Sequence, residues 1–311
     1  MVIEVRWGSA THQGRVRDHN EDALLAGPDV FAVADGMGGY AGGAVASAIA
    51  VARLADLRDL HEVEEPDGVL SAALCRANGE IRRRASADRL VAGMGTTVAG
   101  IARIAGARLL VFNLGDSRVY RLRWGKLRQL SEDHSVVGEL VRAGELTEEE
   151  ARRHPHRNVV TRALGVHDVI EPMVKAIDVR VGDCFLVASD GLFNEVPDAH
   201  MSDVLATPGT VERRARALLD AALQRGGRDN ISVVVVAVAG TDSGDGLEAD
   251  TSPTVTEVSG STGPPGGRGP MITAVPPSSL EPVGRRATPA RPSTVSIPGA
   301  APPGPNRRPA P

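Results

Sequence analysis

The sequence predicts an α+β fold in which antiparallel strands and helices occupy separate stretches of the chain. Residues 95–130 run through short β-rich segments separated by single glycines, the pattern of an antiparallel meander. Apolar residues at helical spacing are instead grouped in residues 44–57 and 69–84. Because no strand, helix, strand alternation follows them, we expect antiparallel rather than parallel pairing.

The first strands lead to an acid and a glycine-rich turn. Residues 2–5 alternate weakly and predict a strand, and residues 14–22 form a polar, charged segment. Residues 30–34 are all apolar and predict a buried strand that ends at Asp35, directly before several glycines. A carboxylate at such a strand end meets water, a ligand or a metal.

Two helices, four strands and a polar excursion follow this turn. We expect helices over residues 44–57 and 69–84, and strands over residues 96–104, 108–113, 118–123 and 127–130. Residues 134–165 are polar and helical, with Thr147 and Glu150 forming a capping box. They predict an excursion from the sheet.

Two more apolar strands and a helix complete the folded part. Residues 185–189 predict a strand that again ends in an acid, Asp190. Thr210 caps a helix that runs to Gln224. Residues 231–239 are apolar on both faces, which predicts a central strand.

The composition changes after Gly240, where 15 of the 21 prolines lie. Such a segment cannot bury enough apolar surface to offset its ordering entropy. We therefore expect a folded domain over residues 1–240 and a disordered tail, rich in Pro, Gly, Ser and Thr, over residues 241–311.

Composition and charge exclude several classes of function. The formal net charge is −4, so there is no basic excess for nucleic acid or an anionic membrane. No apolar run reaches the roughly 18 residues of a membrane span, and we expect a cytoplasmic protein without a membrane anchor. The cysteines, Cys75 and Cys184, make no disulfide framework or zinc site. A cysteine-dependent phosphatase needs an arginine six residues after its nucleophilic cysteine. The residues at that distance from Cys75 and Cys184 are Ile81 and Asp190, so this class of enzyme is excluded.

The glycine-rich turn allows two interpretations. Gly36, Gly38 and Ala41 fit a dinucleotide fingerprint, with Asp56 at about the expected distance of 20 residues. Two points argue against this interpretation. Asp35 would place a negative charge beside the pyrophosphate, and the sequence that follows lacks the strand, helix, strand alternation of a parallel sheet. The other interpretation makes Asp35 a metal ligand and predicts further acids at strand ends.

Such acids occur throughout the sequence. Asp190 and Asp229 also stand at the ends of apolar strands, and Glu21, Asp22 and Asp116 lie at similar junctions. Carboxylates can converge only where something neutralises them, and hard divalent cations with oxygen ligands do so. Without His or Cys in the set, magnesium or manganese is favoured over zinc.

Seven motifs at these junctions resemble the metal-dependent PPM (PP2C-type) serine/threonine protein phosphatases of the bacterial type, over about residues 5–239. They are R-D-H-N-E-D, V-A-D-G-M-G-G, G-T-T, N-L-G-D-S-R-V-Y, N-V-V-T-R-A-L-G, A-S-D-G-L-F-N and G-R-D-N-I-S-V. The resemblance implies a four-layer α-β-β-α sandwich of two antiparallel sheets flanked by helices. Residues 134–165 would be the flap beside the site, a candidate for substrate selection.

The resemblance also implies the site, with two manganese or magnesium ions and a third in bacterial members. Asp35 would bridge two ions, and Arg17 would bind the substrate phosphate. The remaining ligands would be the Gly36 carbonyl, Asp190 and Asp229 directly, Glu21 and Asp22 through water, and Asp116 with Asp190 at the third position. Many eukaryotic relatives have His where this chain has Met37, and the D-G-M-G-G form is typical of bacterial members. Met37 cannot protonate a leaving group, so the general acid is left open.

The implied activity is hydrolysis of phosphoserine and phosphothreonine on proteins by a metal-activated water, with Arg17, Asp35 and Asp190 in catalytic roles. The implied partners are phosphorylated proteins, namely serine/threonine kinases and their substrates. Two alternatives are kept: a phosphatase dedicated to one regulator, such as an anti-sigma antagonist, and a catalytically silent binding module. The complete set of acids argues against the silent module.

Overall fold

The computed structural model describes residues 4–39, 42–240 and 254–256. All of them belong to the first of two units, Met1–Ser261, and the second, Thr262–Pro311, lies outside the described residues. The predicted domain boundary and the disorder of most of the tail therefore stay predictions.

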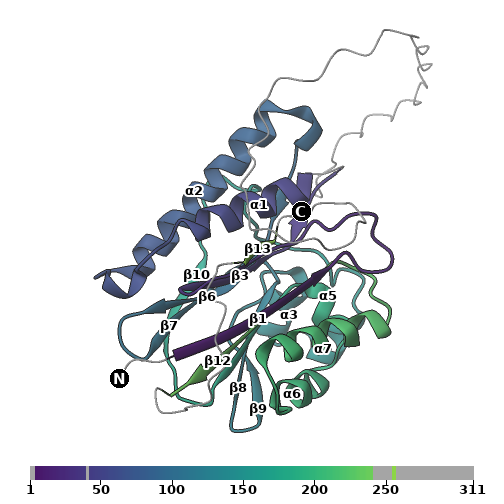
Figure 1. The fold of residues 1–311 in the computed structure, drawn as a ribbon. Coiled ribbons are helices and arrows are strands. Elements are labelled where there is room, and N and C mark those ends of the chain that lie inside the picture. The colour runs from purple at the N-terminus through teal and green to yellow at the C-terminus, as the bar shows by residue number, and fades with distance from the viewer. Residues whose placement is uncertain (1–3, 40–41, 241–253, 257–311) are drawn as a thin grey trace, which may run out of the picture. The chain divides into compact units, whose positions relative to one another are not determined.

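Two antiparallel sheets form the centre of the first unit (Figure 1). The six-stranded sheet has the order β10-β7-β6-β3-β2-β13, and the five-stranded sheet has the order β1-β12-β11-β8-β9. β4 and β5 form a separate two-stranded ribbon. The strands are β1 Glu4–His12, β2 Ala23–Ala26, β3 Val30–Ala34, β4 Gly36–Met37, β5 Gly95–Thr96, β6 Val98–Ile104, β7 Arg108–Leu114, β8 Arg118–Arg123, β9 Lys126–Gln129, β10 Met173–Asp178, β11 Cys184–Ala188, β12 Ile231–Ala239 and β13 Thr254–Thr256.

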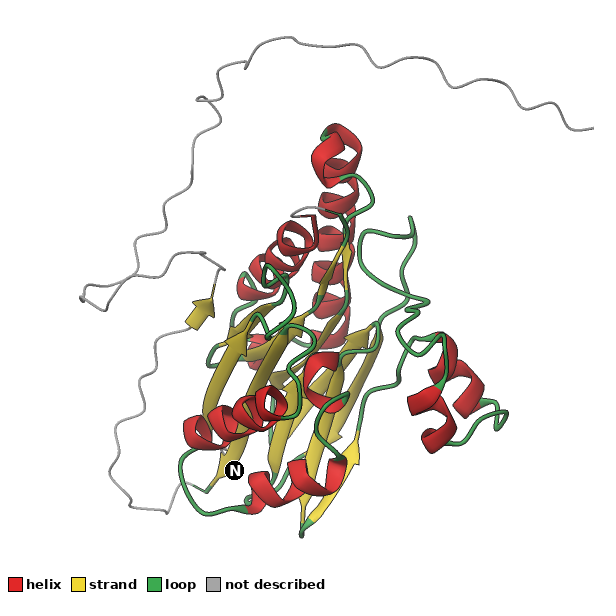
Figure 2. Ribbon diagram, turned by 90° about the vertical axis from the view of Figure 1, so that its right-hand side faces the viewer, coloured by secondary structure: helices red, strands yellow, loops and turns green. Residues whose placement is uncertain are grey.

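Helices cover the outer faces of both sheets, as the two views in Figures 1 and 2 show. α1 and α2 pack on the six-stranded sheet, and α5, α6 and α7 pack on the five-stranded sheet. The helices are α1 Gly42–Ala55, α2 Pro66–Ala87, α3 Val136–Arg142, α4 Glu148–Arg153, α5 Asp190–Phe193, α6 Asp198–Ala206 and α7 Val211–Gln224, with the 3-10 helices η1 Leu60–Glu62 and η2 Arg89–Val91. The predicted four-layer sandwich is confirmed.

The core has three layers because side chains alternate along the buried strands. In β3, Phe31 and Val33 point between the two sheets, whereas Ala32 points toward α1 and α2. In β12, Val234 lies between the sheets and Val235 lies under the helices of the other face. A strand buried on both faces reads as a continuous apolar run, which is why β3 and β12 were recognisable in the sequence.

Strand pairing, and not the local sequence pattern, determines the elements that the sequence predicted incompletely. β1 extends to His12, well beyond the predicted strand, because it pairs with β12 along its whole length. β10 was not predicted, since it is an edge strand whose Lys175 and Asp178 are exposed. The capping box of Thr147 and Glu150 is confirmed at the start of α4.

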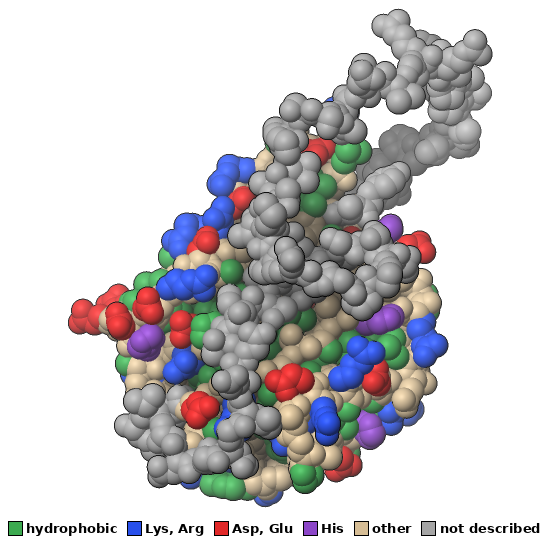
Figure 3. Space-filling model, viewed as in Figure 1, with side chains coloured by type: hydrophobic (Ala, Val, Ile, Leu, Met, Phe, Trp, Pro, Cys, Tyr) green, Lys and Arg blue, Asp and Glu red, His purple; other side chains and the backbone are tan. Residues whose placement is uncertain are grey.

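Three further observations concern the tail, the surface and the helices. Thr254–Thr256 form β13 on β2, so at least this part of residues 241–311 has a regular element where none was expected. Acidic and basic side chains are interspersed on the face seen in Figure 3. In the part of the chain that the structure describes, the helices are too short or too polar to cross a bilayer.

Candidate active site

The predicted acids meet at one end of the sandwich because the topology brings strand ends from both sheets together. Asp35 follows β3 and Asp116 follows β7, and these strands run in the same direction on either side of β6. Asp190 follows β11, and Asp229 precedes β12, its antiparallel neighbour. Acids far apart in the sequence therefore surround one space.

That space is a cavity of about 240 Å³. Its lining contains seven of the eight predicted site residues and six others. The lining residues are Arg17, Glu21, Asp35, Gly36, Met37, Gly38, Thr97, Asp116, Asn158, Val160, Asp190, Asp229 and Asn230. Asp22 is the exception: it is buried outside the lining, where its Oδ2 accepts a hydrogen bond of 2.8 Å from the Ser189 hydroxyl.

The acids share a strongly negative, poorly solvated environment. Burial, with the charges of neighbouring carboxylates, raises the pKa of Asp116 to about 8 and that of Asp22 to about 7. Burial and Asp229 raise the pKa of Asp190 to about 6, although Arg17 acts in the opposite direction. The pKa of Asp35 is raised well above its ordinary value by burial and then by Asp22. The site therefore favours positive charge.

A hard divalent cation fits these donors. Glu21 Oε1 and Asp22 Oδ1 are buried and accept no hydrogen bond in the described structure, which is costly for carboxylates. The acidic groups offer only oxygen, the donor that magnesium and manganese prefer. A Cβ at Gly36 would overlap the carbonyl oxygens of Gly43 and Glu21, so only glycine lets the backbone reach this position.

The acids line the cavity wall without closing on one point. Within the described residues, no three His, Cys, Asp or Glu side chains are arranged as a preformed ligand set. Asp229 is instead engaged by Arg17, whose Nη2 lies 2.7 Å from Asp229 Oδ2. The Arg17 side chain is 53% exposed and the Asp229 side chain 31%, so this pair lies at the solvent side of the site.

Hydrogen bonds from neutral side chains hold the acid-bearing loops in place. The Thr97 hydroxyl accepts from the Asp35 backbone N–H at 3.1 Å, and the Thr96 hydroxyl donates to the Asp35 carbonyl at 2.9 Å. Thr97 and Ser117 join through their hydroxyls at 2.7 Å, which links the Asp35 loop to the Asp116 loop. The G-T-T motif was visible in the sequence, but no role followed from it.

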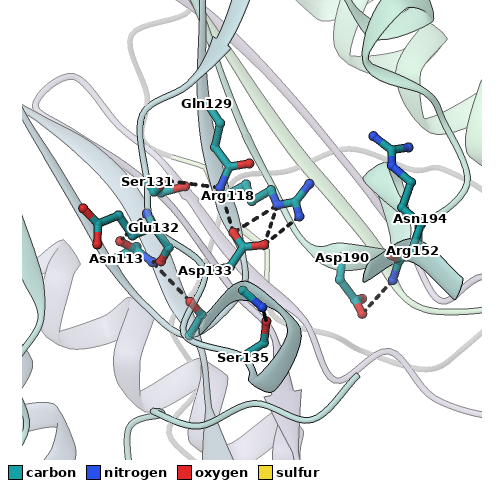
Figure 4. A network of polar contacts seen from close by, with 12 residues as sticks. Asn113, Arg118, Gln129, Ser131, Glu132, Asp133, Ser135, Arg152, Asp190 and Asn194 are labelled. Atoms are coloured by element: carbon teal, nitrogen blue, oxygen red, sulfur yellow. Dashed lines mark hydrogen bonds and ion pairs between the residues drawn. The ribbon is translucent and has the colours of Figure 1, made fainter. Parts of the chain in front are cut away.

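The flap is fastened at its N-terminal root to the strand beside Asp116. Asp133 accepts hydrogen bonds from Arg118 Nη2 at 2.6 Å and from Gln129 Nε2 at 2.7 Å (Figure 4). The Arg118 guanidinium also lies over the Phe193 ring, 4.0 Å from its centroid. β8, the flap and α5 therefore meet at this arginine.

The C-terminal root of the flap is fastened beside Asp35. Leu164 and Thr96 exchange two backbone hydrogen bonds of 2.9 and 3.0 Å. Between the two roots, Asn158 and Val160 reach the cavity lining. Sequence reasoning placed the flap beside the site but did not identify these two residues, because neither carries a charge.

The four-layer sandwich and the oxygen-lined acidic cavity at its strand ends define the class of metal-dependent phosphatases. The antiparallel sheets contradict a dinucleotide fold, and Ala41 of that fingerprint lies outside the described residues. The chain belongs to the protein phosphatase 2C family, whose model matches residues 11–225.

Named relatives are bacterial. The chain is 40% identical over 248 residues to the serine/threonine protein phosphatase PstP of Mycobacterium tuberculosis, covering 78% of this chain and 47% of PstP. It is 39% identical to the serine/threonine phosphatase stp of Listeria innocua, covering 73% of this chain and 93% of stp. The catalytic domain of PstP in complex with two manganese ions superposes with a TM-score of 0.71 at 38% identity, covering 77% of this chain and all of that domain. The chain thus spans about half the length of full PstP.

Proposed function

We propose that this chain is a metal-dependent protein phosphatase that hydrolyses phosphoserine and phosphothreonine on proteins. The observation that carries the proposal is the convergence of buried carboxylates, two of them with unpartnered oxygens, beside a half-exposed arginine. Membership of the protein phosphatase 2C family and the names of the relatives support it.

The proposed cofactors are two manganese or magnesium ions, with a third position. Asp35 would be shared between two ions, and the Gly36 carbonyl would bind one of them. Asp190 and Asp229 would complete the first site, Glu21 and Asp22 would act through water, and Asp116 with Asp190 would hold the third ion. When bound, the cations supply a nucleophile from water at neutral pH and offset negative charge on the phosphate.

The chain's own residues would bind the substrate phosphate. Arg17 offers a planar guanidinium that fits two phosphate oxygens, and it can exchange its contact with Asp229 for the substrate. Asp229 is then released toward the cavity. Met37 also lines the cavity and carries no exchangeable proton, so protonation of the leaving alkoxide falls to water or to another group.

The proposal includes substrates made by serine/threonine kinases and action in the cytoplasm. A phosphatase dedicated to one regulator differs only in substrate range, whereas a silent module would have no use for unpartnered buried acids.

The deciding experiment measures phosphate release from a phosphothreonine peptide with manganese and with excess chelator. Calorimetry of manganese binding to the chelator-treated protein provides a readout other than turnover. We expect binding and metal-dependent release. Full turnover in chelator would remove the metal-dependent mechanism, and metal binding without turnover would support the silent module.

A further inference from the structure

A cluster of cations lies at the β8–β9 hairpin, on the strand ends remote from the cavity. β8 begins at Arg118, beside the site, and ends at the hairpin. Arg121 pairs with Arg128 across the ladder, and Arg123 pairs with Lys126. Residues paired in this way lie on the same face, and like charges placed opposite each other destabilise the ladder. These four residues, with Arg180 near them, are called the basic patch below.

The patch has too few acids to balance it. Asp183 is already paired with Arg123, whose Nε and Nη2 donate hydrogen bonds of 2.6 and 2.5 Å to Asp183 Oδ1 and Oδ2. Among the described residues, no ion pair engages the other four cations of the patch. Arg121 also has a buried Nε without a hydrogen-bond acceptor. Burial, followed by the charge of Arg123, lowers the pKa of Arg121.

An exposed tryptophan stands in the same patch. Trp124 is 79% exposed and has a φ of +52°, in the left-handed region that L-residues rarely adopt. The guanidinium carbons of Arg123 and Arg180 lie 5.8 and 5.3 Å from its ring centroid. Exposed Trp and Arg side chains together are typical of binding hot spots.

Protection of a sheet edge explains only part of this arrangement. β9 is the edge strand of its sheet, and charged side chains on an edge prevent pairing with other strands. Edge protection does not require cations on β8, an exposed tryptophan, or Arg180 from another segment. An anionic ligand accounts for all three.

An acidic segment follows directly in the sequence after Gly240, the last described residue before it. β12 ends at Ala239, and a Cβ on Gly240 would lie 3.5 Å from the side chain of Val181, the neighbour of Arg180. The next ten residues, 241–250, contain four acids and no Lys or Arg. The first arginine of the tail is Arg268. The acids are Asp242, Asp245, Glu248 and Asp250.

We propose that residues 242–250 dock on the basic patch, with their carboxylates against its unpaired cations and Leu247 against Trp124. Because the segment is tethered at Gly240, its effective concentration is on the order of 1 mM, so weak contacts suffice.

The test follows the indole N–H of Trp124 by NMR in the full chain, assigned with Trp124→Phe because Trp7 is the other tryptophan. The test variant neutralises the segment with Asp242→Asn, Asp245→Asn, Glu248→Gln and Asp250→Asn. We expect its Trp124 resonance to move, and salt at about 0.5 M to move the wild-type resonance to the same place. The matched control, Glu257→Gln with Glu281→Gln, removes tail acids outside the segment and should leave the resonance unchanged.

A second measurement adds a peptide of residues 241–250 to the neutralised chain. At about 1 mM the peptide should return the Trp124 resonance toward its wild-type position, and Lys126→Ser with Arg128→Ser should abolish this response. All variants should hydrolyse a small phosphoester at the wild-type rate, which confirms that they fold. A resonance unaffected by neutralisation, or a peptide response that survives loss of Lys126 and Arg128, overturns the proposal.

Discussion

Asn230 joins the acid-bearing loops through a single side chain. Its Oδ1 accepts from the Glu21 backbone N–H at 2.8 Å, and its Nδ2 donates to the carbonyls of Gln13 and His19 at 2.9 and 2.8 Å. The segment that carries Arg17 is thereby fixed to the start of β12. An asparagine in a loop carries no charge or periodicity, so sequence reasoning gave it no role although it follows Asp229.

Replacement of Arg17 by Ala should weaken phosphate binding in both the ground state and the transition state. KM should therefore rise more than kcat falls. Loss of a charge-assisted contact worth about 1.5–3 kcal/mol predicts a fall in kcat/KM of about tenfold to a hundredfold. Arg17→Lys should recover part of this, because the charge returns without the planar fork. Steady-state kinetics on a phosphothreonine peptide provide the measurement, and an unchanged kcat/KM would place phosphate binding elsewhere.

Asp190→Asn and Asp229→Asn should each abolish turnover while the protein stays folded. Both changes remove charge that the cations require, and Asp190→Asn also relieves repulsion among the buried acids. Turnover of a phosphopeptide and thermal melting should be measured on the same samples. Near-wild-type turnover in either variant would exclude that residue as a ligand.

The stability of the metal-free protein should fall as pH rises. Asp116 has an ordinary pKa of 3.8 and a folded-state pKa of about 8, so its contribution is fully present below pH 3.8 and is lost as pH rises through 8. In chelator, Tm should drop less between about pH 5 and 8 in Asp116→Asn than in the wild type. Equal drops would show that Asp116 ionises without penalty.

At the scale of elements, the flap depends on its anchored roots. Its helices α3 and α4 are short, and α4 has no buried residue, so its position is set by contacts at the two ends. At the N-terminal root, Arg118 and Asp133 form a largely buried pair, with side-chain exposures of 23% and 13%. Removal of one partner from such a pair leaves an uncompensated charge.

Asp133→Ala should therefore lower the free energy of unfolding by about 2–4 kcal/mol. Glu149→Ala is the matched control, because Glu149 pairs with Arg153 on the exposed surface of α4 and should cost less than about 0.5 kcal/mol. Urea denaturation of both variants gives the comparison. Similar losses in the two variants would mean that the root pair does not anchor the flap.

The elements also show how far the sequence alone could lead. Residues 30–34 were predicted as a strand and form β3 without a shift, and Thr210 does cap α7, because burial and capping leave local patterns. β10 leaves no such pattern, and the partner of each strand is set by long-range packing. The family resemblance therefore supplied the two-sheet sandwich, and the order of the strands in each sheet was not predicted.

The residues of the site also divide into those that the local sequence indicates and those that it does not. Asp35, Asp190 and Asp229 were identifiable because several acids at the ends of apolar strands together indicate a shared acidic cluster. Asn158 and Val160 belong to the N-V-V-T-R-A-L-G motif, but neither carries a charge, and sequence reasoning gave them no role in the cavity.

At the scale of the whole molecule, the folded domain should work without most of its tail. Deletion of residues 241–311 should leave hydrolysis of a small phosphoester nearly unchanged, because the described residues that line the cavity all come from the part of the chain before this range. The deletion also removes β13, so the β2 amides should exchange faster with deuterated solvent. Hydrogen exchange and kinetics on the truncated chain test both statements. A truncated chain that misfolds or is inactive would show that the folded domain extends beyond residue 240.

Among the described residues β12 is the last long strand, yet it lies between β1 and β11 in its sheet. Arg17 and Asp229, which meet at the site, are 212 positions apart. A chain emerging from the ribosome therefore carries β1 without a partner until almost the whole domain has been synthesised. During translation the acids remain on separate, unjoined segments, and the acidic cavity can form only when synthesis of the folded domain is nearly complete.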